Sequence, residues 1–171
     1  MALIKSFKDF HPQIEKDVFL AENATIIGDV EIGEQSSIWY QAVLRGDVGK
    51  ITIGKLTNIQ DHAMLHTTTN RSVCVVGDRV VVGHRAILHG CRVEDEVLIG
   101  MGAIILDDAV IPSHTIIGAG ALVTEGKVLE SGFLYAGVPA KKIKPITDFQ
   151  KNMIAGSCYH YFDVAKGHLP T

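Results

Sequence analysis

Three histidines in the middle of the chain have the side-chain type and the setting that metal sites use. His66 ends the run "NIQDHAMLH", and His84 and His89 stand five residues apart in "VVVGHRAILHG". Neutral imidazoles bind zinc, iron and cobalt, and three of them leave one position on a tetrahedral metal open. A five-residue gap brings two side chains to the same side of neither a helix nor a strand. Whether these histidines meet therefore depends on the elements that carry them.

A six-residue repeat of aliphatic side chains indicates what those elements are. We place the repeated position at Ile26, Ile32, Ile38, Leu44, Ile53, Ile59, Leu65, Val75, Val81, Ile87, Val93, Ile99, Ile105, Ile111, Ile117 and Val123. Two insertions interrupt the register, one of three residues at 48–50 and one of four residues around 67–72. Glycine often follows the aliphatic residue, where we expect it to give backbone freedom. Small side chains recur four positions after it: Ser36, Ala42, Thr57, Ala63, Cys91, Ala103, Ala109, Thr115 and Ala121.

A hexapeptide period is typical of a parallel β-helix, in which three hexapeptides form one triangular coil. The sequence therefore predicts a mainly β fold, a prism of about five coils, and a C-terminal helix. We expect one domain over 1–171, made of a cap (1–20), coils (21–125), a closing segment (126–146), and a helix and tail (147–171). The helix follows Pro145 with Thr147 or Asp148 as its N-cap, and its apolar side is Phe149, Met153, Ile154, Cys158, Tyr161, Phe162 and Ala165.

Composition excludes several function classes. The formal net charge is −3 and no dense run of lysine and arginine occurs, so we expect no nucleic-acid partner. No apolar stretch is long enough to span a membrane, and the first residues do not form a signal peptide, so we expect a cytoplasmic protein without a membrane partner. The cysteines Cys74, Cys91 and Cys158 fit neither a disulfide framework nor a zinc motif, and we expect buried thiols.

The register places the histidines on the prism. His66 directly follows Leu65, and His89 lies two residues after Ile87, so both stand on the same face of successive coils. His84 lies near a corner and points away from them. If three chains pack around a threefold axis, the corner histidine of one chain approaches the face of the next. A metal site with two histidines from one chain and one from its neighbour would follow, although surface histidines can also be merely solvated.

Polar residues near the histidines extend this candidate site. Arg45, in "LRGD", occupies the position of His66 one coil earlier, and its guanidinium suits a charge pair with Asp47 or Asp61 where two chains meet. Asn58 and Gln60, with Asp61, precede His66 on an adjoining face and are expected to line a groove between subunits. The Gln60 amide can hydrogen-bond solvent on the metal or a substrate oxygen.

The combination of "LRGD", "NIQD", "LH" and "GHRAILHG" resembles the γ-class carbonic anhydrases and their relatives in the hexapeptide-repeat superfamily, over nearly the whole chain. The resemblance implies a left-handed β-helix with a C-terminal helix, assembled as a homotrimer. It implies a metal between subunits held by His66, His84 and His89. By the same resemblance Arg45 and Asp47 support the subunit contact, and Gln60 and Asp61 belong to the site. The family's helix tyrosine corresponds first to Tyr161 and second to Tyr159.

The implied reaction is the reversible hydration of carbon dioxide to bicarbonate by hydroxide on zinc, with iron or cobalt as other metals. Two departures from the family pattern predict low activity: Val48 follows Asp47, and the insertion "TTTNRS" holds no carboxylate, so the acidic proton-shuttle residues are missing. Two alternatives stay open. One is an acyl-CoA-dependent acyltransferase of the same superfamily, which shares an ending like "LYAGVPAKKIK" (134–144). The other is a metal-binding or scaffold protein without turnover.

Overall fold

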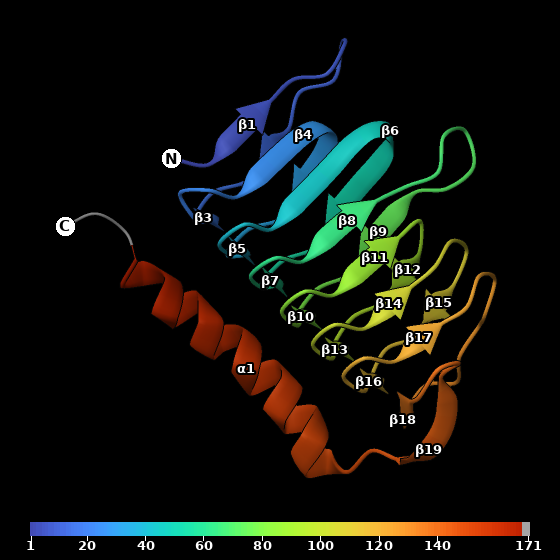
Figure 1. Cartoon of the computed structure of the whole chain (residues 1–171). Coiled ribbons are helices and arrows are strands. Elements are labelled where there is room, and N and C mark those ends of the chain that lie inside the picture. The colour runs from blue at the N-terminus through green and yellow to red at the C-terminus, as the bar shows by residue number, and fades with distance from the viewer. Residues whose placement is uncertain (169–171) are drawn as a thin grey trace.

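The computed structural model of the chain describes residues 1–168, whose strands stack as successive coils of a three-sided prism (Figure 1). We name each face after one of its strands. The β11 face contains β1 (Leu3–Lys5), the first halves of β4 (Thr25–Ile32) and β6 (Val43–Ile53), β8 (Met64–His66), β11 (Ile87–His89), β14 (Ile104–Ile105) and β17 (Leu122–Val123).

The other two faces complete each coil. The β12 face contains β2 (Gln13–Ile14), the second halves of β4 and β6, β9 (Cys74–Val76), β12 (Arg92–Val93) and β15 (Val110–Ile111). The β10 face contains β3 (Phe19–Leu20), β5 (Ser37–Ile38), β7 (Asn58–Ile59), β10 (Val81–Val82), β13 (Leu98–Ile99), β16 (Ile116–Ile117) and β18 (Phe133–Ala136), with β19 (Lys141–Pro145) antiparallel at its end. The neighbours from β1 to β18 pair in parallel, which confirms the predicted solenoid.

One aliphatic side chain per strand points into the prism and stacks on its counterparts above and below. The predicted register is confirmed from Ile26 to Leu65 and from Val93 onward, where these side chains are almost fully buried. It is wrong by one residue between these segments, because the inward residues are Val76, Val82 and Leu88 rather than Val75, Val81 and Ile87. Ile87 is 36% exposed on the outer side.

The error has a local cause. Val80, Val81 and Val82 are consecutive, as are Val75 and Val76, so aliphatic character alone does not identify the inward residue. The second insertion has five residues, since the inward residues Leu65 and Val76 of the successive strands β8 and β9 stand eleven positions apart instead of six. The coil regains the register by a short corner after His89, where Gly90 has φ +59°. Such a left-handed conformation suits glycine.

The small residues predicted at the corners are all buried, because the chain bends there against the coil above. The expected role of the glycines is partly wrong. Gly33, Gly54 and Gly100 do not have positive φ, and a Cβ on Gly100 would lie 2.5 Å from the backbone nitrogen of Ala119. Their role is to let stacked coils approach closely. The left-handed corner positions are held by other residues, such as His62 (φ 61°) and Arg85 (φ 60°).

The two ends of the chain finish the prism. Residues 1–20, expected as a cap, form β1, β2 and β3 and add one further coil in parallel with β4 and β5. Helix α1 (Asp148–Lys166) begins at the predicted N-cap, where the hydroxyl of Thr147 accepts a hydrogen bond from the backbone of Gln150. The helix packs lengthwise on the β10 face (Figure 1). No helix within the described residues has the length and apolar character needed to cross a membrane.

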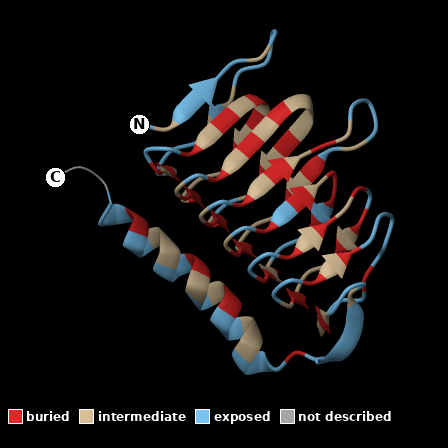
Figure 2. Ribbon diagram, viewed as in Figure 1, coloured by how far each residue is buried: buried red, intermediate tan, exposed pale blue. Residues whose placement is uncertain are grey.

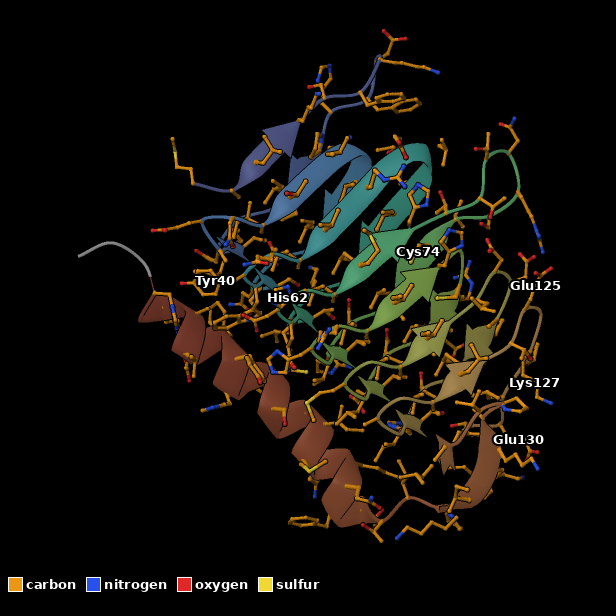
Figure 3. All side chains as sticks on the ribbon, in the orientation of Figure 1. Tyr40, His62, Cys74, Glu125, Lys127 and Glu130 are labelled. Carbon is orange, nitrogen blue, oxygen red and sulfur yellow. The ribbon has the colours of Figure 1, made fainter. Side chains whose placement is uncertain are left out.

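The apolar side of α1 is narrower than predicted. Ile154, Cys158 and Ala165 are buried against the prism, whereas Phe149 is 77% exposed and Met153 is 40% exposed (Figure 2). Near the end of the helix, the ring of Tyr161 packs edge-on against Trp39. All three cysteines are buried and free, as expected, with Cys74 inside the stack of coils (Figure 3). The mainly β fold with one C-terminal helix is thus confirmed.

Candidate metal centre

His66 and His89 meet on the β11 face, as their placement in the repeat predicts. They are paired residues at the ends of β8 and β11, one coil apart. Each directly follows an inward leucine, so the corrected register makes them equivalent. Their nearest ring nitrogens, Nδ1 of His66 and Nε2 of His89, are 3.3 Å apart. Both side chains are partly buried, 16% exposed for His66 and 30% for His89.

Asp47 fixes the ring of His66. Nε2 of His66 donates a hydrogen bond to Oδ1 of Asp47 over 3.1 Å, and Asp47 also accepts one from Arg45 over 2.7 Å. The predicted pair of Arg45 with Asp47 therefore forms within one chain. Burial raises the pKa of Asp47, but the hydrogen bonds from Arg45 and His66 outweigh it, and the pKa lies below its ordinary value. Asp47 is thus a stable acceptor for the His66 ring.

Asp107, which the sequence analysis did not single out, does the same for His89. Nδ1 of His89 donates to Oδ2 of Asp107 over 2.8 Å. Oδ1 of Asp107 accepts a hydrogen bond of 2.5 Å from the hydroxyl of Ser72. Burial raises the pKa of Asp107, but hydrogen bonds from Ser72 and His89 outweigh it, so this carboxyl too has a lowered pKa. The corrected register is the signal for Asp107, because it places the carboxylate one coil after His89, beside the same corner.

These contacts decide which ring nitrogens can bind a cation. A carboxylate only accepts hydrogen bonds, so His66 carries its proton on Nε2 and His89 carries its proton on Nδ1. The remaining nitrogens then face each other with lone pairs. A tetrahedral zinc bound at about 2.0–2.1 Å holds two nitrogen ligands about 3.3 Å apart, which fits the 3.3 Å separation here. The separation and orientation of the two rings are therefore compatible with two nitrogen ligands of one metal ion.

His84 lies at the corner between the β10 and β11 faces with a separate group of polar residues. Its Nδ1 is 2.9 Å from Oδ2 of Asp61, and its backbone N–H donates to Oε1 of Gln60 over 3.2 Å. Nε2 of Gln60 donates in turn to Oδ1 of Asn58 over 3.1 Å. Gln60 and Asn58 are buried, and Nδ2 of Asn58 has no hydrogen-bond partner among the described residues. Asp61 therefore pairs with His84 rather than with Arg45 in this chain.

The two candidate tyrosines differ in their surroundings. Tyr161 is half-buried between α1 and the prism, where burial raises the pKa of its hydroxyl and the charge of Asp61 raises it further. Tyr159 is 55% exposed. Of the two, Tyr161 is the tyrosine close enough to Asp61 to feel its charge, and its role in the site stays a prediction.

Within one chain, the predicted site residues form two groups rather than one. His66 and His89, with Arg45 and Asp47, lie at the edge of the β11 face that adjoins the β12 face. The His84 group lies at the opposite edge, which adjoins the β10 face. The described part of the chain contains no cluster of three or more histidine, cysteine or acidic residues able to hold a metal ion. A single chain therefore offers two close histidine ligands, and any third must come from elsewhere.

Comparison with known proteins places the chain in a family. A family model for "Bacterial transferase hexapeptide (six repeats)" matches residues 11–46. The mitochondrial gamma carbonic anhydrase 2 of Arabidopsis thaliana is 46% identical over 165 residues, which cover 94% of this chain and 59% of that protein. A carbonic anhydrase of Geobacillus kaustophilus is 45% identical over 146 residues, covering 85% of this chain and 80% of that one. The chain thus spans about three-fifths of the plant relative and most of the bacterial one.

Solved structures agree with the sequence comparison. The crystal structure of a hexapeptide transferase family protein from Anaplasma phagocytophilum superposes with a TM-score of 0.93 at 40% identity, covering 98% of each chain. The resemblance recognised in "LRGD", "NIQD" and "GHRAILHG" is therefore matched by named relatives over most of the sequence. The chain belongs to the γ-carbonic-anhydrase family of hexapeptide-repeat proteins.

Proposed function

We propose that the protein is a carbonic anhydrase that hydrates carbon dioxide to bicarbonate at a metal shared between subunits of a homotrimer. His66 and His89 of one chain and His84 of its neighbour would hold the metal. Zinc fits three imidazoles, and iron or cobalt fits them as well. Family membership supports a small-molecule substrate. The cytoplasmic location expected from the sequence stays a prediction, because the relatives include mitochondrial proteins.

The observation that carries the proposal is the orientation of the His66 and His89 rings. Asp47 and Asp107 leave both rings with a lone pair directed at the other across 3.3 Å. Two facing lone pairs repel unless a proton or a metal ion lies between them. Carboxylates on the outer nitrogens of histidine ligands are the usual support of protein metal sites, since they fix the tautomer and the ring orientation.

The outer side of the β11 face supports the shared site. A row of mostly apolar residues crosses all its strands in register: Leu3, Thr25, Val43, Met64, Ile87, Ile104 and Leu122. We call this row the β11 stripe. None of its members is buried in the single chain, and Leu3 and Ile87 are exposed. An exposed apolar row of this kind favours association with another subunit.

The β11 stripe lies between the two groups of site residues. His84 precedes Ile87 at one edge of the face, and His89 follows it at the other. In a threefold ring, the leading edge of one subunit meets the trailing edge of the next. Packing through this face would therefore bring His84 of one chain to the His66–His89 pair of its neighbour. This arrangement completes three ligands without any change in the coil.

The residues around His84 suit the substrate. A bound metal would lower the pKa of water far below its bulk value, toward about 7, and so supply a nucleophile at neutral pH. The side-chain amides of Gln60 and Asn58 are buried beside His84 and carry N–H donors. Such donors can hydrogen-bond the oxygens of bicarbonate. Asp61 keeps the His84 ring oriented through Nδ1. Residues 67–72 hold no carboxylate to accept the released proton, so we expect slow turnover.

The activity test compares metals. Protein loaded with zinc in air, and with iron without oxygen, is assayed for carbon dioxide hydration after its metal content has been measured. We expect hydration above the uncatalysed rate with at least one metal, and loss of that rate on chelation. An acyltransferase would instead show CoA-dependent transfer that survives chelation. Full metal occupancy with no hydration above background would refute the enzymatic proposal.

A further inference from the structure

The insertion 67–72 is built into the support of His89. This segment forms the loop between β8 and β9, which projects from the prism beyond the turns that follow it (Figure 1). The hydroxyl of Ser72 accepts from the backbone N–H of Thr68 over 3.0 Å and donates to Asp107 over 2.5 Å. Asp107 accepts from His89 over 2.8 Å. A continuous line of hydrogen bonds therefore connects the loop backbone to the ring of a candidate metal ligand.

The two side chains in this line pack closely against the corner after His89. Asp107 is 8% exposed. A Cβ added to Gly90, the residue after His89, would lie 2.0 Å from Oδ1 of Asp107 and 2.2 Å from Oγ of Ser72. Both side chains thus rest against the Gly90 backbone. The corner at Gly90, where the chain regains the register, therefore packs directly on the side chains of Asp107 and Ser72.

A second contact ties the loop to the second and third coils beyond it. The guanidinium of Arg71 binds Asp108 over 3.2 Å and also contacts Glu125. Glu125 lies in a turn at the edge of the prism away from α1 (Figure 3). Arg71 is largely solvent-exposed, so its ion pairs contribute little stability by themselves. Their position matters more than their strength, because they hold Arg71, the neighbour of Ser72, over the turn that carries Asp107.

We infer that Ser72 and Asp107 are positioning residues that set the tautomer and orientation of His89, and that the 67–72 loop thereby controls metal affinity. The inference rests on the proposed metal site. In this arrangement Ser72 occupies one oxygen of Asp107 and directs the other at Nδ1 of His89. His89 then keeps its proton on Nδ1 and leaves Nε2 free to bind a cation. A loop without carboxylates thus has a role in building the site.

The first test reads the His89 ring in the metal-free full chain. Nitrogen-15 NMR at pH 8, where an ordinary histidine is neutral, distinguishes the two tautomers. We expect wild-type His89 to be protonated on Nδ1, and Asp107→Ala and Ser72→Ala to redistribute the proton between the two nitrogens. Ser72→Thr, which keeps the hydroxyl, should restore the wild-type signal. Unchanged ring signals in both alanine variants would overturn the inference.

The second test measures zinc affinity by competition with a chelator. Loss of a support of this kind weakens metal binding by about 10–100-fold, which we expect for Asp107→Ala, with a smaller loss for Ser72→Ala. Asp108→Asn is the matched control, because it changes the neighbouring carboxylate and the Arg71 contact but leaves Asp107 and Ser72 intact. Its affinity should stay within twofold of wild type. Thermal unfolding of all variants checks that the fold is kept.

The outcomes separate the two proposals. A zinc affinity of the Asp107→Ala variant within twofold of wild type would refute the positioning role. The proposed function would then still stand. An equal loss of affinity in Asp108→Asn would also refute the positioning role, because the loss would then not depend on the hydrogen bonds that join Ser72, Asp107 and His89. Failure of the wild-type protein to bind zinc, iron or cobalt would refute the proposed metal site, and the nitrogen-15 signals would still decide the role of Ser72 and Asp107.

Discussion

At the scale of single residues, the chemistry of the site depends on two carboxylates as much as on the histidines. Asp47 and Asp107 each hold the outer nitrogen of one ring, so that the inner nitrogens of His66 and His89 converge. Both carboxyls have lowered pKa values in the folded chain, because hydrogen bonds to them outweigh burial. They stay ionised over the whole range in which histidine loses its proton, which keeps the orientation of the rings constant.

A pH dependence of stability follows from Asp107. Its pKa is lowered on folding, so its ionised form stabilises the fold above the unfolded value of about 3.9. That contribution is lost as the pH falls below this value and through the folded pKa. We expect Asp107→Asn to lower the melting temperature of the metal-free protein at pH 6 and to have less effect at pH 3. The exposed Asp9→Asn should show no such difference, and equal effects of Asp107→Asn at both pH values would contradict the assignment.

The sequence predicted part of this site and missed part of it. The proximity of His66 and His89 follows from their places in the repeat, and it survives the one-residue error because the two lie on neighbouring coils. Asp107 and Ser72 were missed, because the predicted register was wrong by one residue before His89 and because hydrogen bonds between corners depend on how each corner bends. Asp61 pairs with His84, a contact between neighbouring coils that spacing alone did not favour over Arg45.

At the scale of elements, the coils are held by close stacking at a few glycines. Gly54 and Gly100 face the backbone of the next coil so closely that a Cβ would meet it at 2.5 Å. The chain therefore requires glycine there for space rather than for an unusual φ. Features that the sequence marks clearly were predicted well. An example is the start of α1 at Thr147, a capping residue that follows Pro145. In the run from Val80 to Val82, any of three valines could have pointed into the prism. Which one does so depends on the packing of the coils and cannot be read from the sequence.

Two glycine substitutions test this distinction. Gly100→Ala places a methyl group against the backbone of the next coil, and we expect a cost of about 1–3 kcal/mol in the free energy of unfolding. Gly156→Ala lies in α1 with no atom within 4 Å of the added Cβ, and replacing a helix glycine should gain about 0.5–1 kcal/mol. Urea unfolding at one protein concentration measures both. Equal stability of the Gly100→Ala variant and the wild type would show that the coils can separate there.

At the scale of the whole molecule, the β11 face fixes how far apart the two groups of candidate site residues lie. The faces of one prism are rigid because every coil hydrogen-bonds to the next, so the spacing between His84 and His89 across the face is fixed. The two histidines are five positions apart in the chain, a step that spans at most about 17 Å. A second subunit laid against the β11 stripe can bring together the edges that one chain holds apart.

Breaking the β11 stripe should separate the subunits. Ile87 belongs to the stripe, lies between His84 and His89 and is 36% exposed, so Ile87→Lys would bury a charge in the proposed contact. We expect this variant to have the mass of a single chain by light scattering and to lose most of its metal. Ile143→Lys, at a 56% exposed position on β19, is the control and should keep the native mass. A trimeric Ile87→Lys variant with full metal content would place the contact elsewhere.

The most direct measurement of the shared metal site is the metal content of a mixture of two variants. His84→Ala and His66→Ala chains, each expected to bind little metal alone, are co-expressed in equal amounts and purified as mixed trimers. Random assembly in a ring pairs an intact His66–His89 chain with an intact His84 neighbour at about a quarter of the sites, so we expect about a quarter of the wild-type metal and a matching return of carbon dioxide hydration. Full metal in either variant alone, or none in the mixture while the wild type is loaded, would contradict a site shared between subunits.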